Sequence, residues 1–201
     1  MSGYSYLNRH PGMRDALNFF GFVILVFVGM VTINSFIFRS FNVVGQSMEP
    51  TFYTGDRLIV NRLPVTMAQL QNDSYVPTRG EIIVFKNPRF VAASGEEYLV
   101  KRVVAFGKER VVVRDGTMRV YNSEKPDGFD PNNSVVQGEP STPVSGEVDT
   151  VVADGTVFVV GDHRDGQHSR DSRNGLGTVP YYDIVGPVGM QIWPLNRAEL
   201  F

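Results

Sequence analysis

Ser47 lies in the stretch VVGQSMEPTFYTGD, residues 43–56, between a Gly-Gln pair and a Met-Glu-Pro-Thr turn. Because the chain contains no cysteine, a thiol nucleophile is excluded and the candidates are serine or threonine hydroxyls. Such a hydroxyl attacks a carbonyl only when an adjacent base takes its proton. Most serines in Gly-x-Ser-x-x-Pro loops are turn residues, so the chemistry depends on whether the chain supplies that base.

Two kinds of base are available to Ser47. His10 precedes a long apolar segment that Ser47 follows, so a membrane would separate the two. His163 and His168 remain open as members of a Ser-His-Asp set. The other route is a Ser-Lys pair, in which the lysine must be desolvated so that a neutral amine is available near neutral pH.

Lys101 is the candidate lysine, in the stretch EYLVKRVVAF, residues 97–106. The alternation of a β-strand places it on one face with three apolar residues, Leu99, Val103 and Ala105. Burial among apolar neighbours disfavours the ammonium form and lowers a lysine pKa. A lysine that extends its amine to solvent from a sheet edge fits the same pattern, so the pattern alone leaves both interpretations open.

The segments around these residues read as short strands. Stretches rich in β-branched residues, each bounded by Gly, Pro, Asn or Asp, occupy residues 56–62, 80–86, 97–106, 109–121, 155–162 and 183–193. Asp115-Gly116 predicts a tight hairpin, and residues 67–80 and 122–149 are predicted surface loops. No convincing helical period follows residue 38. We therefore predict a mainly β, antiparallel domain with a small β excursion at about residues 107–154.

The segment LNFFGFVILVFVGMVTINSFIF, residues 17–38, carries no charge. As a helix it would span roughly 33 Å, close to a hydrocarbon core of about 30 Å. Arg9 and Arg14 precede it and Arg39 follows, so we expect residues 1–16 in the cytoplasm and a domain of residues 39–201 outside the cell membrane. A cleavable signal peptide is the alternative, but NSFIFRSFN offers no small-residue cleavage site, which favours a retained anchor.

Composition narrows the function classes. A length of 201 residues suits one domain with an appendage, and the net charge of −2 without a long Lys/Arg run gives no reason to expect nucleic acid binding. The chain also offers no obvious set of metal ligands.

Four stretches together resemble bacterial type I signal peptidases, the Ser-Lys leader peptidases. GQSMEPTFYTGD resembles the serine block of that family, and RGEIIVFKNP (79–88) its next block. YLVKRVVAF (98–106) resembles the lysine block, and GDHRDGQHSRDSRNG (161–175) the Gly-Asp-Asn-Arg…Ser-x-Asp-Ser-Arg block. One block would be weak, but four in this order after an N-terminal anchor are specific.

The resemblance implies a role for each matching residue. Ser47 would be the acylated nucleophile and Lys101 the general base. Ser169 would hydrogen-bond the lysine and help to orient it, while Asp171 and Arg173 would brace that loop.

Three departures from the family pattern bear on the site. Gly45 stands where some members have a serine that donates to the oxyanion, so a second donor is not identified. His163 replaces the usual Asn, and the loop is two residues longer before Ser169, which leaves Ser172 as an alternative match. Relatives of the endoplasmic-reticulum type use histidine as the base, but the aligned residue here is Lys101, so we interpret His163 as bracing the loop.

The resemblance implies a serine endopeptidase that removes signal peptides from exported preproteins at the outer face of the cytoplasmic membrane. It needs no metal or organic cofactor. Its expected partners are preproteins, the lipid bilayer and, as a further candidate, the protein-export translocon.

Substrate choice is expected to follow from an apolar pocket that admits alanine-like side chains at positions −1 and −3 of an extended peptide. The residues we expect around it are Phe41, Val43, Gly45, Met48, Phe52, Leu58, Val84, Leu99 and Val100. For Phe41 and Phe52, the alternatives of filling the core or resting on the bilayer remain open.

Three other functions are considered. A specialised pilin-maturation peptidase of conjugative transfer would cleave only its partner. A catalytically silent, peptide-binding relative would have no need of Ser47 and Lys101. A self-cleaving repressor-like protease would not explain residues 17–38 and would need a DNA-binding region.

Overall fold

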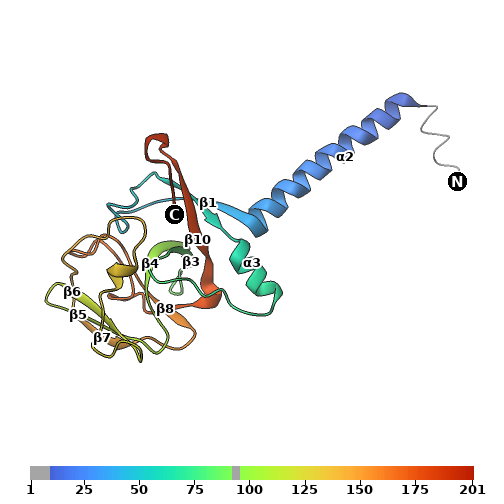
Figure 1. Cartoon of the computed structure of the whole chain (residues 1–201). Coiled ribbons are helices and arrows are strands. Elements are labelled where there is room, and N and C mark those ends of the chain that lie inside the picture. The colour runs from blue at the N-terminus through green and yellow to red at the C-terminus, as the bar shows by residue number, and fades with distance from the viewer. Residues whose placement is uncertain (1–9, 92–95) are drawn as a thin grey trace.

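A long N-terminal helix projects from a β-domain in the computed structural model, which describes residues 10–91 and 96–201 (Figure 1). Helix α2 spans Pro11–Thr32 and continues as one π-helical segment, Ile33–Ile37. None of its residues is buried, and it is long and apolar enough to cross a membrane. The helix thus begins before the predicted anchor of residues 17–38, and Phe38 already belongs to the first strand. Arg9, with the other residues of 1–9, lies outside the described part of the chain.

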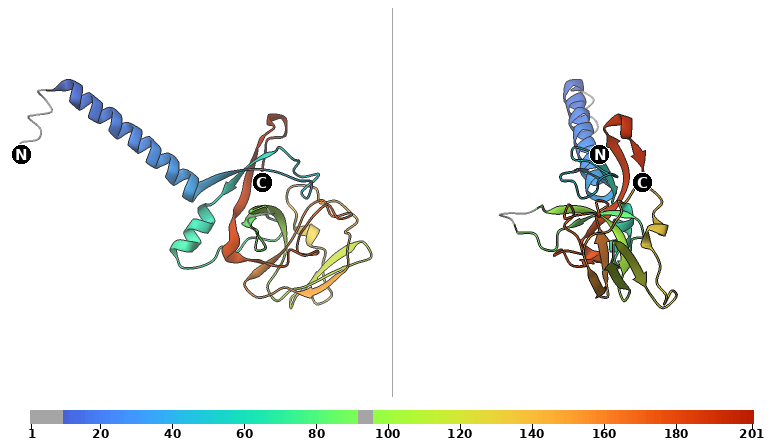
Figure 2. Two further views of the ribbon diagram at one scale, coloured as in Figure 1. Left: turned by 180° about the vertical axis from the view of Figure 1, so that it is seen from behind. Right: turned by 90° about the vertical axis from the view of Figure 1, so that its left-hand side faces the viewer.

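The main sheet is antiparallel throughout. Its strands are β1 (Phe38–Asn42), β2 (Arg57–Asn61), β3 (Ile82–Lys86), β4 (Tyr98–Phe106), β8 (Thr156–Val160), β9 (Val179–Pro180), β10 (Ile184–Trp193) and β11 (Glu199–Leu200). They lie in the order β1-β2-β10-β3-β4-β8-β9, and β11 pairs with β10. The prediction of a mainly β, antiparallel fold is confirmed. Figure 2 shows this sheet curving between the foot of α2 and the rest of the domain.

A second, three-stranded sheet lies between residues 110 and 151. Strands β5 (Arg110–Arg114), β6 (Thr117–Tyr121) and β7 (Val148–Val151) pair in the order β6-β5-β7. Asp115 and Gly116 both have positive φ, 51° and 74°, as the predicted tight hairpin requires. Val111 and Val120 share a core cluster with Phe158 of β8, so the small sheet packs against the main one.

Helix α3 (Leu63–Leu70) was not predicted. It occupies the start of the stretch 67–80, which the sequence indicates as a loop. The helix is only two turns long and buries a single side chain, Val65, so it leaves no extended apolar period to detect. The remaining helical segments are short 3₁₀ turns, η2 (Pro131–Ser134), η3 (Tyr181–Asp183) and η4 (Leu195–Arg197).

A β-bulge changes the alternation of β4. Leu99 and Val103 share one core cluster, as strand alternation predicts. The pairing with β8 shifts between Val103 and Ala105, and Ala105 joins Val104 in the other cluster. The expectation that Ala105 shares the face of Lys101 is therefore wrong, because an extra residue in the strand reverses the facing of those that follow.

A buried ion pair joins β4 to the loop that follows β8. Arg102, which is 1% exposed, donates from Nε to Oδ1 of Asp162 over 2.7 Å and from Nη2 to Oδ2 over 2.5 Å. Its Nη1 donates to the carbonyl of Gly80, and the Thr51 hydroxyl donates to Asp162 over 2.6 Å. The pair therefore fixes the loop that carries residue 163 onward relative to the strand that carries Lys101.

Breaking this pair should destabilise the fold. Asp162→Asn leaves the Arg102 guanidinium buried without its counter-charge, and we expect the free energy of unfolding to fall by about 3–5 kcal/mol, measured by denaturant unfolding of the full chain in detergent. The control is Asp149→Asn, which disrupts the solvent-exposed pair with Arg110 and should cause a much smaller change. Equal effects of the two substitutions would contradict this account of the buried pair.

Candidate active site

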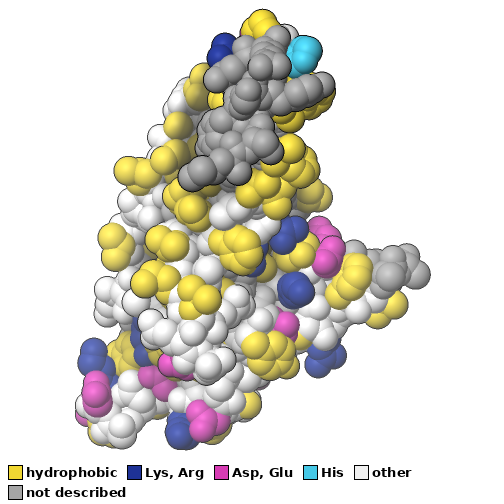
Figure 3. All heavy atoms as spheres, turned by 90° about the vertical axis from the view of Figure 1, so that its right-hand side faces the viewer, with side chains coloured by type: hydrophobic (Ala, Val, Ile, Leu, Met, Phe, Trp, Pro, Cys, Tyr) yellow, Lys and Arg dark blue, Asp and Glu magenta, His cyan; other side chains and the backbone are white. Residues whose placement is uncertain are grey.

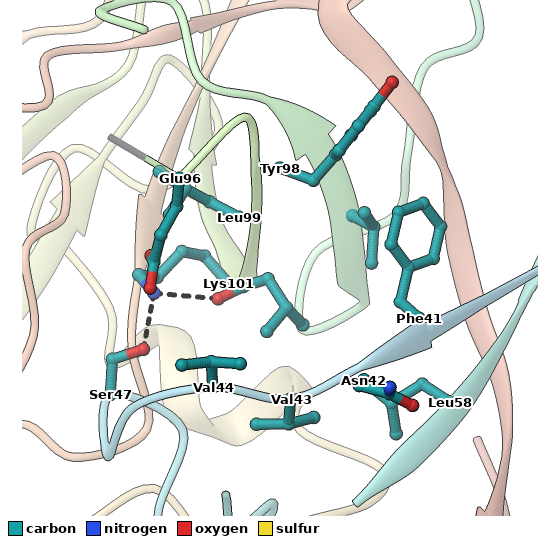
Figure 4. Close-up of a pocket in the computed structure, with 12 residues that line it drawn as sticks. Phe41, Asn42, Val43, Val44, Ser47, Leu58, Glu96, Tyr98, Leu99 and Lys101 are labelled. Carbon is teal, nitrogen blue, oxygen red and sulfur yellow. Dashed lines mark hydrogen bonds between the residues drawn. The ribbon is translucent and has the colours of Figure 1, made fainter. Parts of the chain in front are cut away.

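Ser47 and Lys101 lie in direct contact. The Nζ atom of Lys101 is 2.6 Å from Oγ of Ser47 and 2.9 Å from the carbonyl oxygen of Val100. Ser47 lies in the turn that follows β1, and Lys101 lies in β4, where it stands opposite Ile83 of β3. Figure 4 shows the two side chains pointing toward each other at one end of a pocket. The hydroxyl and the amine are therefore within the distance needed for proton transfer.

Backbone hydrogen bonds and core packing hold the turn that carries Ser47. The amide of Val43 donates to the carbonyl of Asp56, and that of Gly55 donates to Val43, which closes the loop at its base. Met48 and Phe52 are 1% and 0% exposed and belong to the hydrophobic core. We expected both residues to line the pocket, but they pack in the core and hold the loop in place. The alternatives for Phe52 were to fill the core or to rest on the bilayer. It fills the core, where its ring packs against that of Phe201.

Burial makes Lys101 a weaker base than an ordinary lysine. The side chain is 2% exposed, and this desolvation lowers the pKa of Lys101 from 10.5 to about 8. The carboxylates of Asp171, Glu96 and Asp162 act in the opposite direction and raise the pKa, whereas Arg173 lowers it. About a tenth of the amine is therefore neutral at pH 7, far more than for an ordinary lysine.

Ser169 does not contact Lys101 in the way the resemblance implies. Its hydroxyl donates to Oδ2 of Asp171 over 2.6 Å, and among the described residues it forms no hydrogen bond with the lysine. Asp171 also forms a buried ion pair with Arg173, at 2.9 Å. Asp171 thus acts on Lys101 through its carboxylate charge, which opposes the loss of a proton, and Ser169 contacts that carboxylate and not the amine. The alternative match, Ser172, bonds to Val159 and Gly177 and is not part of this cluster.

Gly161 allows the Ser47 backbone and Ser169 to approach each other. A Cβ atom at this position would lie 2.2 Å from the carbonyl oxygen of Ser47 and 2.2 Å from Oγ of Ser169. Its amide also donates to Asp171 over 3.0 Å. Only glycine leaves room for this arrangement, in which the nucleophile's turn rests directly on the loop of residues 161–175.

His163 braces the turn of Ser47 from the other side. Its amide donates to the carbonyl of Ser47 over 3.2 Å, and its Nδ1 is 3.1 Å from the carbonyl of Gln46. Its Nε2 is 3.2 Å from Asp165, and its ring stacks on His168 at 4.3 Å. The imidazole therefore contacts the backbone of the turn and not the Ser47 hydroxyl, as expected for a bracing residue. Within residues 10–91 and 96–201, no cluster of three His, Asp or Glu side chains could hold a metal ion.

The pocket beside the pair has a volume of about 120 Å³. Six residues of the predicted set line it: Phe41, Val43, Leu58, Val84, Leu99 and Val100. Gly45, like Met48 and Phe52, is not among the described residues that do so. Four lining residues were not predicted, namely Asn42, Val44, Glu96 and Tyr98. The expectation considered apolar residues, which left out Asn42 and Glu96, and it took only alternate residues of the stretch 41–44, whereas the pocket is lined by all four of them.

Known proteins of one family resemble this chain over most of its length. A family model described as "Signal peptidase, peptidase S26" matches residues 15–193. Signal peptidase I T of Bacillus subtilis is 29% identical over 178 residues, which cover 88% of this chain and 84% of that protein. Signal peptidase IB of Staphylococcus aureus is 26% identical over 195 residues, covering 92% and 94%. A crystal structure of a signal peptidase I from Enterococcus faecalis aligns with 24% identity and a TM-score of 0.38, covering 56% of this chain and 96% of that one.

The burial of Lys101 should lower the free energy of unfolding at neutral pH, and this penalty should disappear as the pH rises. Below pH 8 the amine is protonated in both the folded and the unfolded chain, and above pH 10.5 it is neutral in both. The unfolded chain binds more protons between these values, so stability rises with pH there. Lys101→Met should therefore be more stable than the parent at pH 7, by up to about 3 kcal/mol, and lose this advantage above pH 10.5.

The measurement is denaturant unfolding of both proteins across this pH range. Lys108→Met is the matched control, because the Lys108 side chain is 79% exposed and its removal should leave the pH dependence unchanged. Parallel curves for the parent and Lys101→Met would contradict a buried, weakly basic amine.

Proposed function

The chain belongs to the signal peptidase family, peptidase S26, and from this premise we propose that it is a membrane-anchored serine endopeptidase that removes N-terminal signal peptides from exported preproteins. The relatives named signal peptidase I align over most of its length. The observation that carries the proposal is the 2.6 Å contact between the Ser47 hydroxyl and the buried amine of Lys101.

Lys101 acts as the general base in this proposal. The Val100 carbonyl accepts one N–H of the amine and so orients the lone pair of the neutral form toward Ser47. When the hydroxyl attacks the scissile carbonyl, its proton moves to Nζ and the acyl-enzyme forms through a tetrahedral intermediate. The backbone N–H of Ser47 is the proposed donor to the oxyanion, a kind of contribution worth about 2.7–4 kcal/mol per donor.

The same lysine completes the reaction. Its ammonium gives the proton to the leaving amine of the mature protein. A water then takes the place of that amine, loses a proton to Nζ and hydrolyses the ester. The carboxylates of Asp171, Glu96 and Asp162 stabilise the ammonium that exists between these steps. In this scheme Ser169 and Arg173 are positioning residues, because they hold Asp171 in place.

The substrate fits between two strand edges. Among the described residues, β1 pairs only with β2, and β4 pairs with β8 only from Arg102 onward. Residues 98–101 therefore leave one edge open to the pocket. An extended peptide can add main-chain hydrogen bonds at such edges. The apolar walls and the volume of about 120 Å³ suit small side chains at positions −1 and −3.

The charges on either side of the anchor support a cleft outside the cytoplasm. Arg14 precedes the apolar stretch and Arg39 follows its end, and with Arg9 the excess of positive charge lies on the N-terminal side. We therefore assign the N-terminus to the cytoplasm and the β-domain to the opposite side, where signal peptides are cleaved from exported chains. The bilayer is then a partner of the enzyme in addition to the preprotein.

Removing either member of the pair should abolish cleavage. Ser47→Ala and Lys101→Met should each lower kcat/KM for a labelled preprotein by at least about 10⁴-fold, while Lys108→Met and His163→Asn retain activity. N-terminal sequencing of the product identifies the cleaved bond. Cleavage that survives Lys101→Met but is lost in His163→Ala would assign the base to histidine and overturn the Ser-Lys mechanism.

Glu96 should set the pH dependence of the reaction. Its carboxylate lines the pocket and raises the pKa of Lys101, so Glu96→Gln should move the acid limb of the kcat/KM profile to lower pH and increase activity at pH 7. On that limb a shift of about 0.3 unit doubles the rate.

The matched control for this experiment is Glu97→Gln. Glu97 is the neighbouring exposed carboxylate, and it does not line the pocket. An unchanged acid limb in Glu96→Gln, or an equal shift in both variants, would show that Glu96 does not act on the amine.

A further inference from the structure

A second hollow lies beside the loop of residues 161–175, apart from the apolar pocket. Its volume is about 550 Å³, and residues 166–174 form one side of it while Ser145 and Gly146 form the other. Gly166 and Gln167, which line it, belong to the stretch that makes this loop two residues longer than the family pattern. The hollow is therefore a feature of the part of the chain that departs from that pattern.

The lining of this hollow carries positive charge only. Within the described part of the chain, Arg170 and Arg173 line it, and no Asp or Glu does so. Arg173 is committed to the fold, because its side chain is 4% exposed and pairs with Asp171 at 2.9 Å. Arg170 is exposed and forms no ion pair or hydrogen bond with any residue that the structure describes. One guanidinium at the hollow thus remains available for a ligand.

The acidic residues near this loop do not neutralise Arg170. Asp165 lies 3.2 Å from Nε2 of His163, and Asp171 is occupied by Arg173. Glu147 follows Gly146 in the sequence but does not line the hollow. A guanidinium without a carboxylate partner favours an anion, and it binds a carboxylate through two parallel hydrogen bonds.

A continuous series of contacts joins the hollow to the turn of the nucleophile. Nδ1 of His163 is 3.1 Å from the carbonyl oxygen of Gln46, which precedes Ser47. The His163 ring stacks on that of His168 at 4.3 Å. Gly166 packs against His168, since a Cβ atom on this glycine would lie 3.1 Å from the imidazole. The two imidazoles thus extend from the nucleophile's turn to the rim of the hollow.

The geometry of the apolar pocket determines which part of a substrate passes this rim. In the proposed function, residues −1 and −3 occupy the pocket, and Ser47 and Lys101 stand at one end of it (Figure 4). The residues after the scissile bond therefore leave beyond that end, where the loop of residues 161–175 rests on the turn. Because an extended chain advances about 3.3 Å per residue, the first five of them span roughly 16 Å.

We propose that this hollow is a subsite for the mature part of the preprotein, in which Arg170 binds an acidic side chain within the first five residues after the scissile bond. The inference rests on the proposed function and adds a second selection to it. Small side chains before the scissile bond are chosen by the apolar pocket, and charge after the bond is chosen by Arg170. A lysine at the same position is repelled.

The preference is measured with labelled preproteins that carry a single Glu, Gln or Lys at each of positions +1 to +5. We expect kcat/KM for Glu to exceed that for Gln by about three- to tenfold at one or two adjacent positions, and Lys to be cleaved more slowly than Gln there. Added salt should reduce the ratio, because the partners are exposed. Figure 3 shows hydrophobic side chains gathered around α2, with most charged side chains farther from it. The full chain is therefore held in a non-ionic detergent, which covers the apolar helix and adds no charge.

Substitution of Arg170 assigns the preference to this side chain. Arg170→Gln should bring the Glu/Gln ratio close to one, and Arg170→Glu should reverse the preference in favour of Lys. The matched control is Arg119→Gln. Arg119 is also exposed, lies on β6 and bonds the carbonyl of Gly128, and it does not line the hollow. Its substitution should leave the ratio of the parent in place.

A Glu/Gln ratio near one at all five positions in the parent would overturn the proposal. So would a loss of the preference in Arg119→Gln as large as in Arg170→Gln, or an Arg170→Glu variant that still prefers Glu.

Binding is measured separately from cleavage. Fluorescent peptides with the same substitutions are titrated onto Ser47→Ala, and we expect the dissociation constants to show the same preference for Glu, because the subsite takes no part in bond breaking. A parent that cleaves none of the preproteins would contradict the proposed function. Equal dissociation constants for the Glu and Gln peptides would instead contradict the subsite.

Discussion

The site depends on excluding water from the amine of Lys101, which lies 2.6 Å from the hydroxyl of Ser47. Two successive residues of β4 show how differently the fold treats buried cations. Arg102 is 1% exposed and receives a full counter-charge from Asp162 through two hydrogen bonds. Lys101 is 2% exposed but is given only a hydroxyl and a carbonyl as hydrogen-bond partners, while the carboxylates remain at longer range. A direct ion pair would keep Lys101 protonated, and a protonated amine cannot act as a base. The fold therefore stabilises the charge of Arg102 with a carboxylate and provides no such partner in contact with Lys101.

The remaining contacts of the site position the nucleophile against this amine. Met48 and Phe52 hold the turn of Ser47 from the core, and the loop of residues 161–175 holds it from the other side. That contact needs Gly161, because a methyl group there would overlap the Ser47 carbonyl. His163 then supplies both a backbone and a side-chain contact to residues 46 and 47. The histidine that departs from the family pattern therefore contacts the turn, and in the proposed mechanism the base is the lysine.

Much of this arrangement could be predicted from the chain alone. Strands rich in β-branched residues, the Asp115-Gly116 hairpin and the uncharged anchor each have a local signal, and each predicted strand corresponds to an observed one. The strands β1, β7, β9 and β11 were not predicted, and β7 begins within the predicted loop of residues 122–149. What could not be predicted depends on contacts between distant segments. The bulge in β4 appears only in its pairing with β8, and the hydroxyl of Ser169 could be assigned to Asp171 only once both were placed. Met48 and Phe52 lie in the core, whereas Phe41 lines the pocket. Which of the two environments an apolar side chain enters depends on how the loop folds, and the residue type alone does not specify it. Helix α3 was missed because it is only two turns long and buries a single side chain, Val65, which leaves no extended apolar period.

The path of the chain connects the anchor to the site. Helix α3 is held at the end of the apolar helix by three hydrogen bonds to residues 35–37. The π-helical segment Ile33–Ile37 joins α2 to β1, and Ser47 lies in the turn that follows β1. Strands β1 and β4, whose residues line the pocket, belong to the same sheet. In the proposed mechanism, anchor and nucleophile are thus connected through a few residues of regular structure, which leaves little freedom for the scissile bond to miss the hydroxyl once the substrate occupies the pocket.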